Sequence, residues 1–147
     1  MPKKTTNNSR LKNFLSKDKE KDRSEFIAAI IINIILWFIV NNLLNWNLSF
    51  ISPTFIQVQG IIYLLITTTI LINVIFLFYQ ATWFRNLLKM ITDILGILVA
   101  YTLLVVFPFI LNEVLALVLT ILLILAIIGG IIGLIIHLLK VIYVLSD

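Results

Sequence analysis

Asp93 and His137 have the most suggestive chemistry in the chain, because both are ionisable and both fall inside long apolar runs. A carboxyl and an imidazole can exchange protons or hold an ion, and ionisable residues within membrane spans often do so. Asp93 follows Lys89 by four residues, and His137, the only histidine, precedes Lys140 by three. We therefore expect the two at one depth, and in contact if their helices are antiparallel neighbours.

Two interpretations of Asp93 stay open from the sequence. Residues 94–111 are already 18 uncharged residues, so Asp93 can lie at the membrane interface in the first turns of its helix. There it would pair with Lys89 on the same face, and we favour this structural interpretation over an ion or proton site. One Asp and one His fall short of the ligands of a usual zinc site, so we expect no metal and no cofactor.

Asn33 and Asn73 are a second pair of polar residues inside apolar runs. If the first two spans form a hairpin with Phe26 opposite Gln80, the two amides stand at the same level. Interhelical hydrogen bonds of this kind contribute about 0.6–2 kcal/mol in a membrane. We favour a packing role for the two amides over a role in substrate binding.

Small residues recur at helical spacing in the last apolar run. Gly129 and Gly133 form a GxxxG pair, and Ala126 and Gly130 form a second pair with the same spacing. Small residues let helix backbones approach closely, which drives helix association in lipid. Both a homodimer and packing within one chain are open, and we prefer packing within the chain. The expected partners lie on the preceding span, at Gly96 and Ala100.

The apolar runs that contain these residues are long enough to be membrane spans. A helix needs about 20 apolar residues to cross about 30 Å of hydrocarbon. Four runs qualify: about 26–44, 55–79, 90–109 and 114–143. The chain has 147 residues, of which 61% are hydrophobic and 12% charged, and a small water-soluble domain could not bury that much apolar surface. The sequence therefore predicts an all-α membrane protein, an antiparallel four-transmembrane-helix bundle over residues 26–147.

The breaks between the runs contain residues that begin and end helices. Ser52 or Thr54 is expected to cap the second helix, and Asn112 the fourth. Pro108 is expected to end or kink the third helix near its far end.

Basic residues are distributed on one side of this topology. With four spans, the two termini lie on the same side, and all eleven Lys and Arg residues fall in the tail, in the middle connection or near the C-terminus. Because cytoplasmic segments of membrane proteins are enriched in Lys and Arg, we predict an integral plasma (inner) membrane protein with both termini in the cytoplasm.

Residues 1–25 form a basic tail that also holds four acidic residues. Leu11, Phe14 and Leu15 have helical spacing between basic residues, which is typical of a short helix on anionic lipids of the inner leaflet. The simpler interpretation is a tail that sets topology, and we rank it first. The acidic residues dilute the charge and no binding motif is present, so we expect no nucleic-acid partner.

Three short stretches carry a resemblance. They are Asn41-Asn42-Leu43-Leu44, Trp83-Phe84-Arg85 and Val106-Phe107-Pro108-Phe109. In these stretches the chain resembles a group of small prokaryotic four-span membrane proteins that are uncharacterised. The resemblance implies four helices and no particular function.

The sequence favours a non-enzymatic structural or interaction protein in contact with the lipid bilayer. No phosphate-binding loop, nucleophile elbow or zinc-protease motif occurs in the chain, so an enzyme ranks last. The alternative is a transporter or channel subunit that works as a homo-oligomer, with a polar path near Asp93 and His137. Convergence of Asn33, Asn73 and Asp93 on one cavity would favour that alternative.

Overall fold

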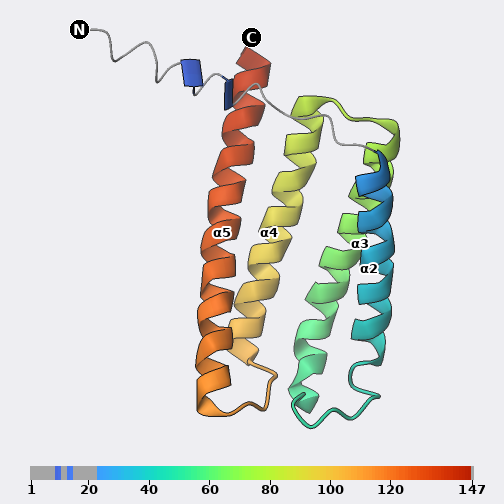
Figure 1. Cartoon of the computed structure of the whole chain (residues 1–147), viewed down its shortest axis with the longest axis vertical. Helices are drawn as coiled ribbons and strands as arrows, with labels where there is room; N and C mark the ends of the chain where they lie inside the picture. The colour runs from blue at the N-terminus through green and yellow to red at the C-terminus, as the bar shows by residue number, and fades with distance from the viewer. Residues whose placement is uncertain (1–8, 11–12, 15–22, 147) are drawn as a thin grey trace, which may run out of the picture.

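Four long helices make up the computed structural model, which describes residues 9–10, 13–14 and 23–146. They are α2 (Arg23–Asn42), α3 (Ile56–Phe78), α4 (Thr82–Val106) and α5 (Glu113–Ser146), with a short 3-10 helix, η1 (Pro53–Phe55), before α3. Figure 1 shows the helices side by side, each running opposite to the one before it. The predicted all-α, four-helix fold class is confirmed.

Each of the four helices is long and apolar enough to cross a membrane. The shortest, α2, has 20 residues and the longest, α5, has 34, which at 1.5 Å per residue correspond to lengths of about 30 and 51 Å. Most of their large apolar side chains are exposed, and in α5 only Leu123 is fully buried. Lipid rather than water must solvate such surfaces, so the chain is a membrane protein.

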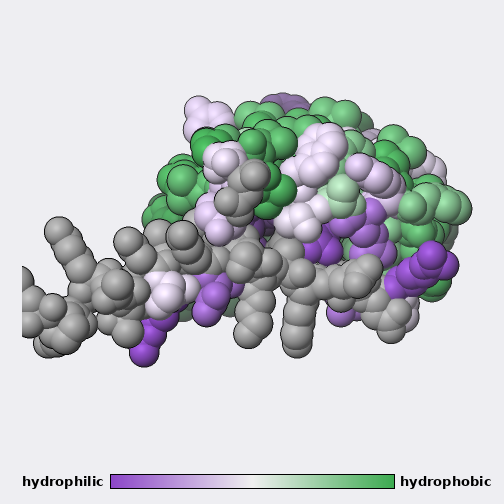
Figure 2. Space-filling model, turned by 90° about the horizontal axis from the view of Figure 1, so that it is seen from above, coloured by the Kyte–Doolittle hydropathy of each residue, from purple (hydrophilic) through white to green (hydrophobic). Residues whose placement is uncertain are grey.

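The helices pack in the order of the chain: α2 on α3, α3 on α4, and α4 on α5. Basic residues mark one end of this row. Arg23 begins α2, Arg85 and Lys89 lie in the first turns of α4, and Lys140 lies near the end of α5. We call this the basic end. Figure 2 looks onto it and shows hydrophilic residues across this end, with hydrophobic residues around them.

Phe26, Ile72 and Phe76 form a buried cluster near the basic end, and Leu77 and Leu88 pack against it. The rings of Phe26 and Phe76 lie with their centroids 5.4 Å apart, in a tilted arrangement. The cluster takes its residues from α2, α3 and α4, so it holds three of the four helices at one level.

The opposite end, which we call the loop end, is held together by main-chain groups. The α2–α3 and α4–α5 connections meet in an antiparallel β-bridge between Ile51 and Phe109. The amide of Ser52 donates to the carbonyl of Pro108, and the amide of Ile110 donates to the carbonyl of Phe50, both at 2.9 Å. The bridge satisfies polar groups that would be costly to leave unpaired near lipid.

The predicted caps are found in part: Ser52 caps η1 rather than α3, whose N-cap Phe55 makes no side-chain cap hydrogen bond, and Asn112 caps the fourth helix. Ser52 is the N-cap of η1, and its hydroxyl oxygen accepts from the Thr54 amide at 3.3 Å. Asn112 accepts from the Leu115 amide at 2.9 Å, at the start of α5. The preceding helix, α4, ends at Val106, before Pro108, because Phe107 takes a left-handed conformation with φ 41°.

The start of α4 differs from the span expected over residues 90–109. The helix begins at Thr82 and includes residues 82–89, in which the side chains of Arg85 and Asn86 are buried. The expectation that Asp93 lies in the first turns of its helix was therefore wrong: it lies eleven residues into α4.

Candidate functional site

Asp93 of α4 and His137 of α5 meet in the structure. The His137 Nδ1 atom lies 2.6 Å from Asp93 Oδ2, and the side chains are 20% and 23% exposed, respectively. Antiparallel packing of α4 and α5 brings together two residues that are 44 positions apart in the chain. The side chain that is hydrogen-bonded to the Asp93 carboxylate is thus His137, whereas the expected pairing with Lys89 stays a prediction.

Two glycines of α5 lie beside this contact. A Cβ atom added at Gly133 would lie 3.4 Å from Asp93 Oδ2, an ordinary van der Waals distance, so the carboxylate faces this glycine. A Cβ added at Gly130 would lie 2.6 Å from Ile97 Cγ1, closer than real Cβ contacts allow. Gly130 therefore lets α4 approach α5 closely near the pair.

The Asp93–His137 pair lies farther from the basic end than the buried cluster. Leu88 packs against this cluster, and Asp93 lies five residues beyond Leu88 on α4, which corresponds to about 7.5 Å along the helix. Uncompensated charge on a helix surrounded by lipid is costly, so the bond between the two side chains matters for their burial in the span.

The pair makes a single hydrogen bond within the described residues. Because an ionised carboxylate only accepts, His137 Nδ1 carries a proton when Asp93 is charged. The second ring nitrogen, Nε2, is then free to bind a further proton. Both side chains of the pair are partly exposed.

Basic side chains flank the pair on the side of the basic end. Lys89 lies one turn before Asp93 on α4, and Lys140 lies three residues after His137 on α5. The Lys140 Nζ atom lies over the ring of Phe14, 5.5 Å from its centroid. Phe14 is thus one described residue through which the tail contacts α5. Leu11 and Leu15, the other apolar residues of the predicted interfacial helix, lie outside the described part of the chain.

Asn33 and Asn73 do not form the interhelical pair expected of them. Asn33 Nδ2 donates to the Ala29 carbonyl at 2.8 Å, and Asn73 Nδ2 donates to the Thr69 carbonyl at 2.7 Å. Both bonds lie within one turn of the residue's own helix. The reason is physical: an i−4 carbonyl is always within reach of a side chain on a helix, and a partner helix is not.

Another polar network joins α2 to α3 and was not foreseen. The Tyr63 hydroxyl donates to Asn41 Oδ1 at 3.0 Å. Gln59 Nε2 donates to the Tyr63 hydroxyl at 2.9 Å and to the Val40 carbonyl at 3.0 Å. The spacing of Gln59 and Tyr63, one helical turn, was the available signal.

The small residues of α5 divide between two faces. Gly130 and Gly133 face α4, where Ile97 and Asp93 lie. Ala126 and Gly129 are exposed, and a Cβ added at Gly129 would meet no atom within 4 Å. The same holds for Gly96, one of the expected partners, whereas the other, Ala100, is buried.

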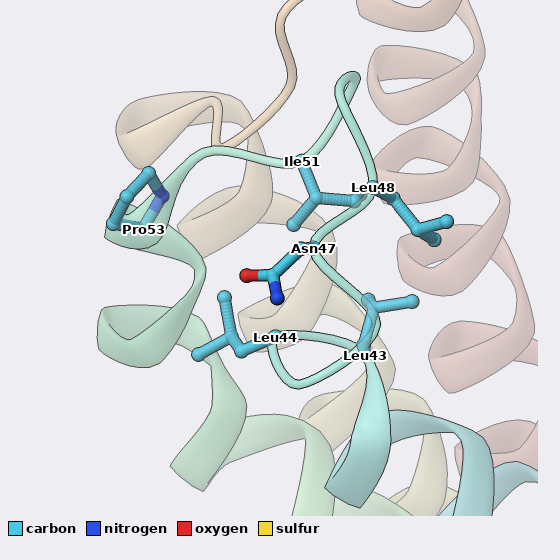
Figure 3. A pocket seen from close by; sticks show the side chains of 6 residues that line it. All are labelled: Leu43, Leu44, Asn47, Leu48, Ile51 and Pro53. Carbon is cyan, nitrogen blue, oxygen red and sulfur yellow. The ribbon is translucent and has the colours of Figure 1, made fainter.

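A pocket of about 290 Å³ lies at the loop end, on the opposite side of the molecule from the basic end. Figure 3 shows the amide of Asn47 among the side chains that line it, which are those of Leu43, Leu44, Leu48, Ile51 and Pro53. Asn47 has a positive φ of 49°, a conformation that Asn tolerates better than most residues. None of the predicted polar residues lines this pocket.

Comparisons of the chain with protein-family models, with curated proteins and with solved structures found no match. The interpretation of the site therefore rests on its own residues.

Proposed function

We propose that the protein is a non-enzymatic structural or interaction protein of the cytoplasmic membrane, with both termini in the cytoplasm. One observation supports this proposal: the polar side chains within the helices form hydrogen bonds with different partners and do not meet in one place. Asn33 and Asn73 each bond to their own helix, while Asp93 bonds to His137 across α4 and α5. A substrate path would instead need these groups to line one hydrated route through the bundle.

The orientation is supported by where the described basic residues lie. Arg23, Arg85, Lys89 and Lys140 are all at the basic end, and Glu113 is at the loop end. Translocating the basic end across the membrane would oppose the usual bias of Lys and Arg toward the cytoplasm. Under this proposal, anionic lipids of the inner leaflet are partners for the basic end, and nucleic acid is not.

The orientation can be tested with a matched pair of serine substitutions, because the chain has no cysteine. Ser49→Cys lies in the α2–α3 connection at the loop end, and Ser146→Cys lies at the end of α5. In intact cells, a membrane-impermeant thiol reagent is expected to label Ser49→Cys only. Labelling of Ser146→Cys in intact cells would contradict the proposed orientation.

The interaction role can be tested against transport in the same preparation. Photo-crosslinkers at exposed positions of two helices, Phe38 on α2 and Leu122 on α5, report on protein neighbours in the native membrane. Crosslinking to one defined protein, or to a second copy of the chain, is expected at one of the two positions. Crosslinking to lipid alone at both positions would remove the proposal.

The second candidate function is a small transporter or channel subunit. It is favoured by one observation, the Asp93–His137 pair between two helices that are long and apolar enough to span a membrane. Purified protein in liposomes with an imposed pH gradient would then dissipate the gradient, and Asp93→Asn would abolish this flux. A flux equal to that of empty liposomes excludes the transport of protons.

A further inference from the structure

The Asp93–His137 pair has two states that differ by one proton and by one unit of charge. With Nδ1–H donating to an ionised Asp93 and no proton on Nε2, the pair has a net charge of −1. A proton from water that binds at Nε2 produces an imidazolium beside a carboxylate, with no net charge. The apolar surroundings oppose the charged state, since an isolated charge is costly in lipid.

The charged groups around the pair are few and lie toward the basic end. On α4 they are Arg85 and Lys89, and on α5 the nearest is Lys140, with Glu113 at the far end of the helix. The titratable residue of α3 is Tyr63, which is engaged with Asn41 near the loop end. The charged groups nearest to the pair along the helices are therefore Lys89 and Lys140, and Tyr101 of α4 and Tyr143 of α5 are the tyrosines of the same two helices.

The bundle does not enclose the pair completely, because His137 and Asp93 are each about one-fifth exposed. Lys89 and Lys140 lie within about 6 Å of the pair along their helix axes. Long Lys side chains keep their ammonium groups at the hydrated interface, and water accompanies them.

We propose that Asp93 and His137 form a proton-binding site, open toward the basic end, whose occupancy holds α4 against α5. The bond between Asp93 and His137 joins α4 to α5 close to where Gly130 admits Ile97 of α4, so the charge of the pair is connected to helix packing. When the proton leaves, the net charge of −1 favours movement of Asp93 toward water, which breaks its contact with His137 and lets the helices separate at this level. The site can operate whether or not the protein binds a partner.

The sole histidine makes proton binding directly observable. Full-length protein labelled with 15N-histidine, in lipid nanodiscs, gives the signals of His137 alone. We expect the signals of both ring nitrogens to change as a proton binds. In Asp93→Asn, proton binding is expected to weaken at least about tenfold, because a charge-assisted hydrogen bond favours the protonated imidazole by at least this factor.

Glu113→Gln is the matched control, because it also replaces an acid by its amide. It lies 24 residues from His137 along α5, or about 36 Å, so the proton affinity of His137 should change less than about twofold. Equal changes in Asp93→Asn and Glu113→Gln overturn the proposal. So does a wild-type ring that stays in one state from about pH 4 to 10. This second result needs no variant and holds even if Asp93→Asn fails to fold.

The packing part of the proposal has its own measurement. Spin labels at two exposed positions near the pair, Ile91→Cys on α4 and Leu139→Cys on α5, report the separation of the helices. Raising the pH through the His137 titration should widen this distance by about 2 Å or more, which is typical of helix shifts. The same labels in Asp93→Asn should show no pH response. A wild-type distance that is constant across the titration overturns the coupling to packing.

Discussion

Gly130→Ala should destabilise the protein because the space for its methyl group is already occupied. The added Cβ would lie 2.6 Å from Ile97 Cγ1 and 3.3 Å from its Cδ1, and 3.8 Å from the carbonyl oxygen of Asp93. Cγ1 is not the far end of a flexible chain, so Ile97 must change rotamer or α4 must move. Overpacking of this kind costs about 1–3 kcal/mol.

The neighbouring glycine provides the matched control. At Gly129 the same methyl group would meet no atom within 4 Å, so Gly129→Ala adds no clash and gains the helix preference of Ala over Gly, about 1 kcal/mol. Both variants can be compared with the wild type by thermal or denaturant unfolding in one detergent, followed by circular dichroism. We expect Gly130→Ala to be less stable than Gly129→Ala by about 2–4 kcal/mol.

A double-mutant cycle identifies the cause of the loss. In an Ile97→Ala background the clashing atoms are gone, so most of the cost of Gly130→Ala should disappear. Equal stability of Gly130→Ala and Gly129→Ala would refute the close packing of α4 on α5. A cost that persists unchanged in the Ile97→Ala background would show that the reasoning from Ile97 is wrong.

Three further predictions concern other parts of the fold, all measured by the same unfolding assay. Asn112→Ala removes the acceptor of the Leu115 amide and should cost about 0.5–2 kcal/mol. Tyr63→Phe breaks the hydrogen-bonded link between Gln59 and Asn41 and should cost about 0.6–2 kcal/mol of stability. Tyr101→Phe, which changes an exposed ring, should leave the stability unchanged. Equal effects of the two variants would contradict the network. Phe26→Ala empties the buried cluster of α2, α3 and α4 and should cost about 3–5 kcal/mol, and a loss below about 1 kcal/mol would argue against that core.

Much of the fold is predictable from the sequence because lipid imposes a simple rule on length. Apolar runs of about 20 residues must be helices, and the polar breaks between them supply caps such as Ser52 and Asn112. The same rule on length gave the wrong start for α4. A search for uncharged runs leaves out residues 82–89, because they contain Arg85 and Lys89, although this segment belongs to the helix.

The candidate site was predictable in part. The meeting of Asp93 and His137 follows from their similar distances to basic residues, four and three positions, and from the antiparallel packing of adjacent helices. The faces of the helices were not predictable, because a helix that is apolar all round has no stripe that marks its packing side. This is why Ala126 and Gly129 are exposed while Gly130 and Gly133 contact α4, and why Tyr63 rather than Asn33 and Asn73 joins α2 to α3.

The β-bridge between Ile51 and Phe109 has a consequence for the order in which the protein assembles. The two bridged residues are 58 positions apart in the chain, and two complete helices, α3 and α4, lie between them. The bridge therefore cannot form until α4 has crossed the membrane and residues 107–110 have reached the loop end. Until then the amide of Ser52 and the carbonyl of Phe50 depend on water or headgroups. Slow hydrogen exchange at the amides of Ser52 and Ile110 would therefore show when the α2–α3 hairpin and the α4–α5 hairpin have joined at the loop end.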